Sequence, residues 1–482
     1  MLISRRRLTQ CTPLRKVDVC ICGSWYTMST VKKCDNVANL TYPSYAVAAV
    51  GGRHVVVGGG GGAAKTGIKN QFDVYELYHN GNQTVGERVL SYDVGDDCIT
   101  NMVAWPGAIT AATSVKTAPV ITLAIGQEEK CVIMKLKPAL GAMKKEEVTL
   151  QHSSKGKDKG HTAGLRKRRI SEKSAEEGST EKEEISEEKK RRRSLNTTIR
   201  GTKYFTFDAE KLSSTQTVFK NKEEEVYQKC CGISPDYKFL VTGGTDGYLR
   251  IWNLPDMKKE RQIKAHDKEV DALDIRPDCK QIVSVCKPTY ECCVWNLKDG
   301  KKVTHVVLQT NGVKYKCFRA RYGIVEGNYQ QTKLFTISNP VMGSKNPSIV
   351  SKWCGKTYKQ ERTKDLSGSL SSLALSDNGQ YLATGTMRGS VYILIAFSLQ
   401  QLRVIEEAHS TFVTGLEWLP THNKVSQMVR GYSDASVLSI SCDNSLKIHH
   451  IPRPGMVPVW VVAILATVVL CFAFLLANLL GL

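Results

Sequence analysis

The chain lacks the cysteine patterns of a disulfide framework or a zinc site. Its 16 cysteines are scattered from Cys11 to Cys471, with no repeated C-x-x-C spacing. In a chain of 482 residues this indicates reduced thiols and a cytosolic compartment. A secretory signal is missing as well, because the apolar stretch at 17–22 is short and is interrupted by Asp18. These absences exclude the disulfide-rich secreted domains and the zinc-ribbon domains.

A phosphate-binding P-loop is also missing, although one stretch comes near to it. Residues 58–70 read GGGGGAAKTGIKN and contain the lysine and threonine of the pattern G-x-x-x-x-G-K-[ST]. Ala64 stands where the second glycine of that pattern belongs. Residues 72–77, FDVYEL, alternate apolar and polar side chains as a strand does, whereas a P-loop leads into a helix. We therefore interpret the stretch as a glycine loop between two strands, with left-handed backbone or close approach to a ligand or partner.

The net charge of +21 does not by itself assign a partner. Residues 144–194 combine 16 basic with 11 acidic residues and contain no aromatic residue, which predicts a disordered charged insertion. Residues 1–33 hold seven basic residues and one acidic residue, and we expect a disordered N-terminal extension. The remaining positive charge suits anionic lipid as well as nucleic acid. Basic runs at 166–169 and 189–193 resemble nuclear-localisation patches, and the alternative is a solvated insertion between two strands.

The rest of the sequence repeats in units typical of a WD-repeat β-propeller. Residues 231–252 read CGISPDYKFLVTGGTDGYLRIW, and Trp295 follows Trp252 by 43 residues. Two units before the insertion and five after it predict an all-β fold, a seven-bladed WD-repeat β-propeller over residues 34–455. The length alone would also allow eight blades.

Several motif residues of these repeats are expected to be structural. We expect them to pack inside blades or to form turns rather than to act in a site; they are Trp252, Trp295, His266, His409 and Asp246. No blade has the full hydrogen-bonded set of a regular WD repeat in the sequence. The unit of Trp252 lacks the preceding histidine, and Thr289 replaces the expected aspartate in the unit of Trp295. The sequence thus predicts divergent blades.

The last part of the chain is an apolar run without charge. Residues 459–480 are interrupted only by Thr467 and Asn478. At about 1.5 Å per residue the run spans roughly 33 Å, enough for a hydrocarbon core of about 30 Å. We therefore predict a single C-terminal transmembrane helix at 457–480, with 481–482 on the lumenal side. Because Arg453 precedes the run, the positive-inside rule places the propeller in the cytosol.

Taken together, these motifs resemble the prolactin regulatory element-binding protein family, the endoplasmic-reticulum membrane exchange factors for the Sar-type small GTPase. The resemblance covers most of the chain, and its most specific stretch is GGGGAAKTGIKN at 59–70. The supporting motifs are Gly243–Gly247, Ile395–Gln400, Glu407–His409 and Val457–Trp460. Residues 1–33 have no counterpart in the resemblance.

The resemblance implies a guanine-nucleotide exchange factor that promotes GDP release from the Sar-type GTPase and so starts assembly of the COPII vesicle coat. It makes and breaks no covalent bond, so no catalytic residues in that sense and no enzyme activity are expected. The resemblance also implies that the glycine loop contacts the GTPase; the matching residues are Lys65, Thr66, Gly67, Ile68 and Asn70. It further implies a structural potassium ion in the loop; the matching residues are Gly59, Gly60, Gly61, Gly62, Ala63 and Thr66.

Two other classes of function stay open on the sequence. The family name records DNA binding, so a transcription regulator with a nuclear pool is the main alternative, although no helix-turn-helix or zinc-finger spacing is visible. A WD-repeat scaffold at the membrane without exchange activity is the other. The expected location is the endoplasmic-reticulum membrane, with the propeller facing the cytosol.

Overall fold

The computed structural model describes residues 34–62, 67–107, 120–142, 203–219, 226–308, 310, 312–325, 328–341, 346–431, 433–453 and 459–480. The chain forms two units. Lys33–Pro452 is one unit, and Arg453–Leu482 with Met1–Lys32 is the other. The first unit contains seven antiparallel sheets of four strands each.

The first three blades use the chain from Ser44 to Lys264. Blade 1 is built of β2 (Ser44–Val50), β3 (His54–Gly59), β4 (Asn70–His79) and β5 (Thr84–Gly95). Blade 2 is built of β6 (Ile99–Pro106), β7 (Ile121–Gln127), β8 (Lys130–Ala142) and β9 (Lys203–Gln216). Blade 3 is built of β10 (Gln228–Ile233), β11 (Phe239–Gly244), β12 (Tyr248–Asn253) and β13 (Lys258–Lys264).

The other four blades follow in chain order. Blade 4 is built of β14 (Ala272–Ile275), β15 (Gln281–Cys286), β16 (Glu291–Asn296) and β17 (Lys302–His305). Blade 5 is built of β18 (Tyr315–Val325), β19 (Asn328–Pro340), β20 (Ser348–Cys354) and β21 (Gln360–Leu366). Blade 6 is built of β22 (Leu370–Leu375), β23 (Tyr381–Thr386), β24 (Val391–Ile395) and β25 (Gln401–Ile405). Blade 7 is built of β26 (Val413–Trp418), β27 (Ser433–Ser441), β28 (Ser445–Pro452) and β1 (Asp35–Asn39).

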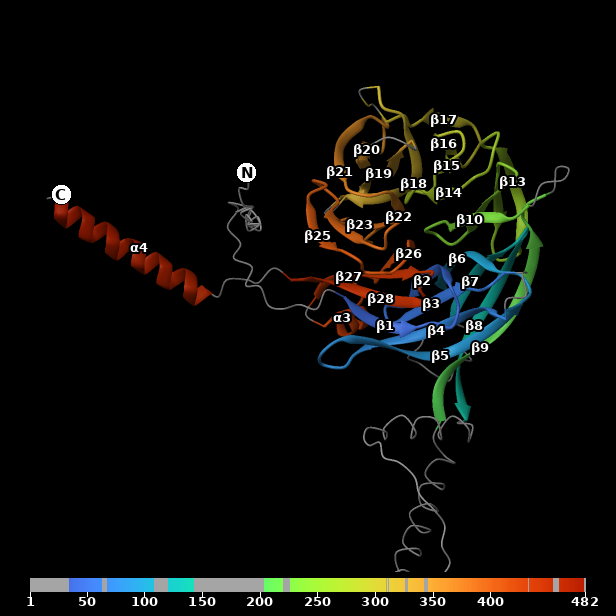
Figure 1. The fold of residues 1–482 in the computed structure, drawn as a ribbon, viewed down its shortest axis with the longest axis horizontal. Coiled ribbons are helices and arrows are strands. Elements are labelled where there is room, and N and C mark those ends of the chain that lie inside the picture. Colours follow the sequence, from blue (N-terminus) through green and yellow to red (C-terminus); the bar gives the residue numbers. More distant parts are fainter. Residues whose placement is uncertain are drawn as a thin grey trace, which may run out of the picture. The chain divides into compact units, whose positions relative to one another are not determined.

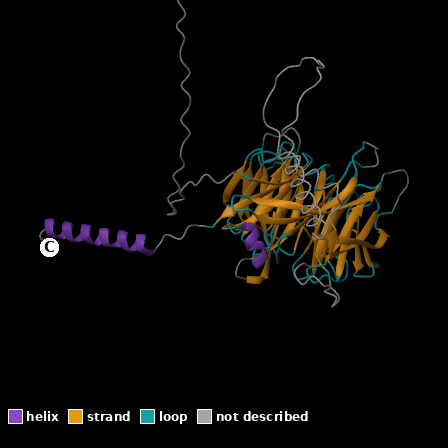
Figure 2. Cartoon of the chain, turned by 90° about the horizontal axis from the view of Figure 1, so that it is seen from below, coloured by secondary structure: helices purple, strands orange, loops and turns teal. Residues whose placement is uncertain are grey.

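The seven sheets are the blades of a ring (Figure 1). The innermost strands of neighbouring blades contact one another in the order β2, β6, β10, β14, β18, β22, β26 and back to β2. Figure 2 shows the same ring edge-on. Each blade buries its faces against its two neighbours, which is how a propeller leaves few exposed sheet surfaces. The predicted all-β, seven-bladed propeller is confirmed.

Blade 7 joins the two ends of the ring. Its outermost strand, β1, comes from the start of the described chain and pairs antiparallel with β28, with Asp35 opposite Ile448 and Asn39 opposite Ser445. Beyond this pairing, Leu40 N donates to Asn444 O at 2.7 Å. The sequence analysis did not foresee this closure, because a five-residue strand without a repeat motif gives no periodic signal.

The antiparallel order fixes two faces of the ring. Turns between the second and third strands of a blade, and the connections from one blade to the next, all lie on one face. Because it carries the glycine loop between β3 and β4, we call it the loop face. Turns between the first two and the last two strands lie on the opposite face. We call that the insertion face, because the connection between β8 and β9 belongs to it.

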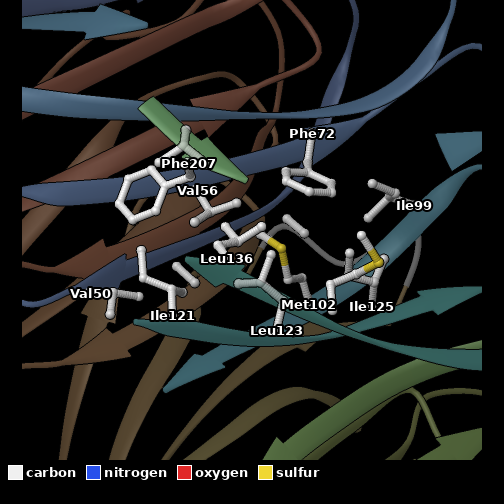
Figure 3. Close-up of a cluster of buried hydrophobic side chains, with 14 of the residues drawn as sticks. Val50, Val56, Phe72, Ile99, Met102, Ile121, Leu123, Ile125, Leu136 and Phe207 are labelled. Atoms are coloured by element: carbon white, nitrogen blue, oxygen red, sulfur yellow. The ribbon is translucent and has the colours of Figure 1, made fainter. Parts of the chain in front are cut away.

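The core that supports the glycine loop lies between blades 1 and 2 (Figure 3). It consists of apolar side chains from both sheets; the labelled ones are Val50, Val56, Phe72, Ile99, Met102, Ile121, Leu123, Ile125, Leu136 and Phe207. Val56 on β3 and Phe72 on β4 are fully buried. Burial of such side chains contributes about 1.5–3 kcal/mol each, so both strands that enter the loop are firmly held.

The predicted insertion 144–194 lies outside the described residues. The two strands on either side of it pair along their whole length, from Lys130 opposite Gln216 to Ala142 opposite Lys203. The same face of the ring carries a short helix that the sequence did not predict, α3 (Lys424–Arg430), between β26 and β27. Asn423 caps it by accepting a hydrogen bond from Val425 N at 2.9 Å, and the buried Arg430 donates to Thr421 O at 2.8 Å.

The second unit contains the helix α4 (Val459–Leu480), over the run predicted as a membrane anchor. Among the residues that the structure describes, no helix is long and apolar enough to cross a membrane. The helix is therefore confirmed, and the predicted transmembrane span is not supported.

Candidate glycine-loop site

The glycines at the start of the loop are required by packing. A Cβ atom on Gly58 would lie 3.0 Å from the side chain of Ile99, and one on Gly59 would lie 2.0 Å from the carbonyl oxygen of Pro43. Gly60 has φ +150°, and its Cβ would lie 2.2 Å from Asn70 Oδ1. Gly58 and Gly59 belong to β3 and sit against neighbouring segments, so both are part of the strand that leads into the loop.

Asn70, the first residue of β4, holds the loop from inside. Its side-chain oxygen accepts a hydrogen bond from Gly62 N at 2.9 Å. Its side-chain nitrogen donates to Gly95 O at 3.1 Å and to Asp96 O at 2.6 Å, with a longer contact to Gly62 O at 3.5 Å. Asn70 is buried, so each of these bonds is shielded from water. One amide therefore joins the loop to the connection between blades 1 and 2.

The outer part of the loop is exposed. Gly62 and Gly67 have φ +74° and +78°, and neither would have a neighbour within 4 Å of an added Cβ. At these two positions glycine is favoured by the left-handed backbone conformation rather than by close packing. Ile68 is 41% exposed although it is a large apolar residue. Ala63, Ala64, Lys65 and Thr66 lie outside the described residues.

A charged pair flanks the exposed part. Lys69 Nζ lies 3.3 Å from Asp93 Oδ2, with both side chains at least half exposed. The pKa of Asp93 is lowered, first by the hydrogen bond from Gly95 N and then by Lys69. Burial raises the pKa of the nearby Cys98 thiol, which makes it a weak nucleophile. The pair is exposed and adds little stability, so its role is to orient the chain after Gly67.

A hollow of about 580 Å³ lies beside the loop. Glycines, polar residues and Ile68 line it; the residues are Gly62, Gly67, Ile68, Lys69, Asn70, Asp93, Gly95 and Asp96. Gly95, Asp96 and Cys98 were missed by sequence reasoning. The Gly95-Asp96 turn gives no local sign that it meets a loop about 30 residues earlier, because that proximity arises from the register in which β5 pairs with β4, with Gly95 opposite Asn70.

The described part of the loop offers backbone carbonyl oxygens as possible ligands for a hard cation. Those of Gly62, Gly95 and Asp96 already accept hydrogen bonds from the Asn70 amide nitrogen, and the Gly60 carbonyl oxygen lies 3.8 Å from the Cys98 thiol. Backbone carbonyl oxygens are the donors that potassium sites use. Of the six predicted ion ligands, Gly60, Gly61 and Gly62 lie in this part of the loop, and Gly59 lies at the end of β3. Ala63 and Thr66 are among the residues not described.

A second cluster, His266, Glu291 and Cys293, has its potential ligand atoms within 4.8 Å of one another. Both nitrogens of His266 are already engaged. Nε2 lies 2.8 Å from Ser284 Oγ, and Nδ1 lies 2.9 Å from Glu291 Oε2. Trp295 Nε1 donates to the same Ser284 hydroxyl at 2.8 Å. These side chains thus form a hydrogen-bonded network inside blade 4, and their role is structural.

Blade 7 contains a comparable network. His409 Nε2 lies 2.7 Å from Ser439 Oγ, and His409 Nδ1 lies 3.0 Å from Asp443 Oδ2. His449 Nε2 meets the same serine at 2.7 Å, where a tryptophan stands in blade 4. Neither blade has the regular set of residues, as the sequence predicted, but each forms a comparable network with a substituted member. Glu291 replaces the aspartate in blade 4 and His449 replaces the tryptophan in blade 7, and residue-by-residue matching misses such exchanges.

Comparison with known proteins identifies WD repeats in two parts of the chain. The family model described as WD domain, G-beta repeat, matches residues 214–253 and 359–393. Each match begins in the outermost strand of one blade and continues into the next blade.

Among curated proteins, the chain is 33% identical over 275 residues to the mouse guanine nucleotide-exchange factor SEC12 and 31% identical over 275 residues to the rat protein of that name. The chain is a relative of the SEC12 guanine-nucleotide exchange factors. It is also 24% identical over 246 residues to SEC12-like protein 2 of Arabidopsis thaliana. That match covers 51% of this chain and 56% of the Arabidopsis protein. The mouse and rat matches each cover 55% of this chain and 64% of the relative's length.

This relationship confirms the resemblance drawn from the glycine loop and the WD repeats. The match to the SEC12 factors spans less than two thirds of their length, so the activity of the whole relative does not pass to this chain by similarity alone. The roles of individual loop residues also stay predictions. The geometry of the loop has to supply the further argument.

Proposed function

We propose that this chain is a guanine-nucleotide exchange factor that acts through its glycine loop on a small GTPase of the Sar type. The observation that carries the proposal is the way the loop is built. Its base is fixed by Asn70 and by glycines that fit against other segments, whereas Ile68 projects an apolar side chain into solvent. An exposed apolar residue on a rigid support is an arrangement suited to a protein partner.

An exchange factor needs only to bind one state of its partner more tightly than another. If the loop binds the nucleotide-free GTPase better than the GDP form, reciprocity requires that it lowers the affinity for GDP. A loop whose two ends are already fixed loses less entropy on binding, so more of the contact energy remains for this difference. In this proposal Ile68 makes the apolar contact, Lys65, Thr66 and Gly67 touch the GTPase beside it, and Asn70 keeps the loop in place.

A nucleotide-exchange assay tests this proposal. The full-length chain in detergent is mixed with a Sar-type GTPase loaded with fluorescent GDP. We expect faster GDP release, and Ile68→Ala should slow it about tenfold, because the lost apolar contact is worth about 1.5 kcal/mol or more. Met428→Ala is the matched control, since Met428 is 77% exposed and lies on α3 at the insertion face. No acceleration by the intact chain would contradict the exchange activity and favour a scaffold.

We also propose that potassium occupies the carbonyl cluster of the loop. Gly60 and Gly62, with Gly95 and Asp96, supply oxygens in the described part, and Gly59, Gly61, Ala63 and Thr66 are the other proposed contacts. A bound cation would hold these carbonyls together and keep the loop ordered.

The ion is tested apart from activity. Amide hydrogen exchange of residues 58–70 is measured in potassium chloride and in sodium chloride of equal ionic strength. We expect about tenfold greater protection in potassium, which corresponds to about 1.4 kcal/mol of added local stability. Residues 84–95 of β5 provide the internal reference. Equal protection of the loop in both salts would contradict the ion site.

We further propose that exchange takes place at the endoplasmic-reticulum membrane and leads to COPII coat assembly. The relationship to the SEC12 factors supports this location. A DNA-binding regulator is the weaker alternative. Within the described residues of the propeller unit the helix is α3, with seven residues, and it forms no helix-turn-helix with a second helix of that unit.

A further inference from the structure

A second hollow on the loop face lies between blades 4 and 5. Its volume is about 410 Å³. It is bounded by the turn between β15 and β16, by the connection between β17 and β18, and by the neighbouring strands. Its lining is mainly apolar or aromatic; it includes Tyr290, Val306, Val307, Leu308, Val313 and Trp353.

The walls of this hollow, which we call the blade 4–5 pocket, carry apolar side chains that are exposed to solvent. Val307 is 58% exposed and Tyr290 is 45% exposed. Trp353 is buried and donates through Nε1 to Thr336 Oγ1 at 2.9 Å, so its ring is fixed. A fixed aromatic ring below exposed aliphatic rims offers a preformed place for one apolar side chain.

Two lysines lie at the pocket. Lys314 is exposed and lines it, and Lys316 Nζ lies 5.6 Å from the centre of the Tyr290 ring. The residues that line it include no aspartate or glutamate. The nearby Glu291 is engaged by His266 and by Thr289. The charges of Lys314 and Lys316 therefore remain available to an acidic partner, and apolar walls make such an attraction stronger than it would be in open water.

We propose that the blade 4–5 pocket docks an acidic segment of a partner protein, anchored by one aliphatic or aromatic side chain. The side chain enters beside Tyr290 and Val307, and the carboxylates on either side of it pair with Lys314 and Lys316. Blades 4 and 5 are not neighbours of blade 1 in the ring, although both sites lie on the loop face. The segment therefore binds while the glycine loop is engaged elsewhere.

The test uses the full-length chain and defined probes. Fluorescein-labelled hexapeptides contain five aspartates or glutamates and one central phenylalanine, leucine or alanine, and binding is followed by fluorescence anisotropy. We expect the phenylalanine or leucine probe to bind about tenfold more tightly than the alanine probe, since one buried side chain contributes that much or more. The double variant Lys314→Glu/Lys316→Glu and the single variant Val307→Asp should each weaken binding about tenfold or more.

Controls separate this site from general charge and from the exchange site. Lys424→Glu reverses an exposed charge on α3 at the insertion face and should leave probe binding unchanged. The thermal midpoint of each variant shows that it is folded, and GDP release should be unchanged in the lysine variants. Equal binding of all three probes, no binding at millimolar probe, or binding that survives both pocket variants would overturn the proposal. Impaired exchange in the lysine variants would likewise overturn it, because the pocket would then belong to the GTPase contact.

Discussion

Replacing Gly60 with alanine is expected to slow GDP release about a hundredfold, because a displacement of about 1 Å at a working site can cost that much. The added Cβ would lie 2.2 Å from Asn70 Oδ1 and 2.6 Å from Asn70 Cα. The Cα cannot move without disturbing β4, so the loop has to shift. The left-handed φ of +150° adds backbone strain for any side chain. The measurement is the rate of fluorescent GDP release in the presence of the variant.

A matched glycine provides the control for this substitution. Gly81 has φ +97°, and nothing lies within 4 Å of the position that an added Cβ would take. It belongs to the turn between β4 and β5 on the insertion face. Gly81→Ala therefore introduces strain of a similar kind without pushing on Asn70, and its exchange rate should equal that of the unmodified chain. If Gly60→Ala retained full activity while its fold was intact, the loop position would not matter for exchange.

The second large effect concerns the stability of blade 3. Asp246 Oδ2 accepts a hydrogen bond from Arg250 Nη2 at 2.7 Å, and both side chains are only 3% exposed. Arg250 also donates to Thr217 O at 2.8 Å, and its guanidinium lies 4.8 Å from the centre of the Phe219 ring. Asp246→Ala leaves this cation buried without its carboxylate. We expect a loss of about 3–5 kcal/mol in the free energy of unfolding, measured by denaturant titration.

An exposed ion pair tests whether burial is the cause. Lys137 Nζ lies 2.7 Å from Glu210 Oε2, the same distance as in the buried pair, but both side chains are about half exposed. Glu210→Ala should leave the unfolding midpoint unchanged, since water replaces the lost partner. Equal destabilisation by the two substitutions would show that Asp246 acts through something other than neutralising a buried charge.

Much of the fold could be predicted because the blades repeat. The strand that follows the glycine loop, the hairpins on either side of the insertion and the unit ending at Trp252 all follow the pattern of apolar alternation and turns. Trp252 donates to Thr242 Oγ1 at 2.9 Å, as expected of a packing residue. Patterns of this kind are local, so one sequence suffices to find them.

What the sequence could not provide depends on contacts between distant segments. Asn70 belonged to the predicted loop, but its acceptors Gly95 and Asp96 become its neighbours only through the register in which β5 pairs with β4. The helix α3 is seven residues long and too short to be stable alone, so the cap at Asn423 and the buried Arg430 decide it. The apolar walls of the blade 4–5 pocket come from two blades and form no motif in either.

The pairing of β1 with β28 has a consequence for the order in which the protein forms. Asp35 and its partner Ile448 are separated by nearly the whole propeller sequence, so β1 cannot pair with β28 until the ribosome has released almost all of the propeller. Six blades can assemble during synthesis while β1, made first, waits for its partner β28. Without β1, β28 has an open edge that another strand could join. A chain started or cut beyond Asn39 would keep that edge permanently and would be prone to aggregate.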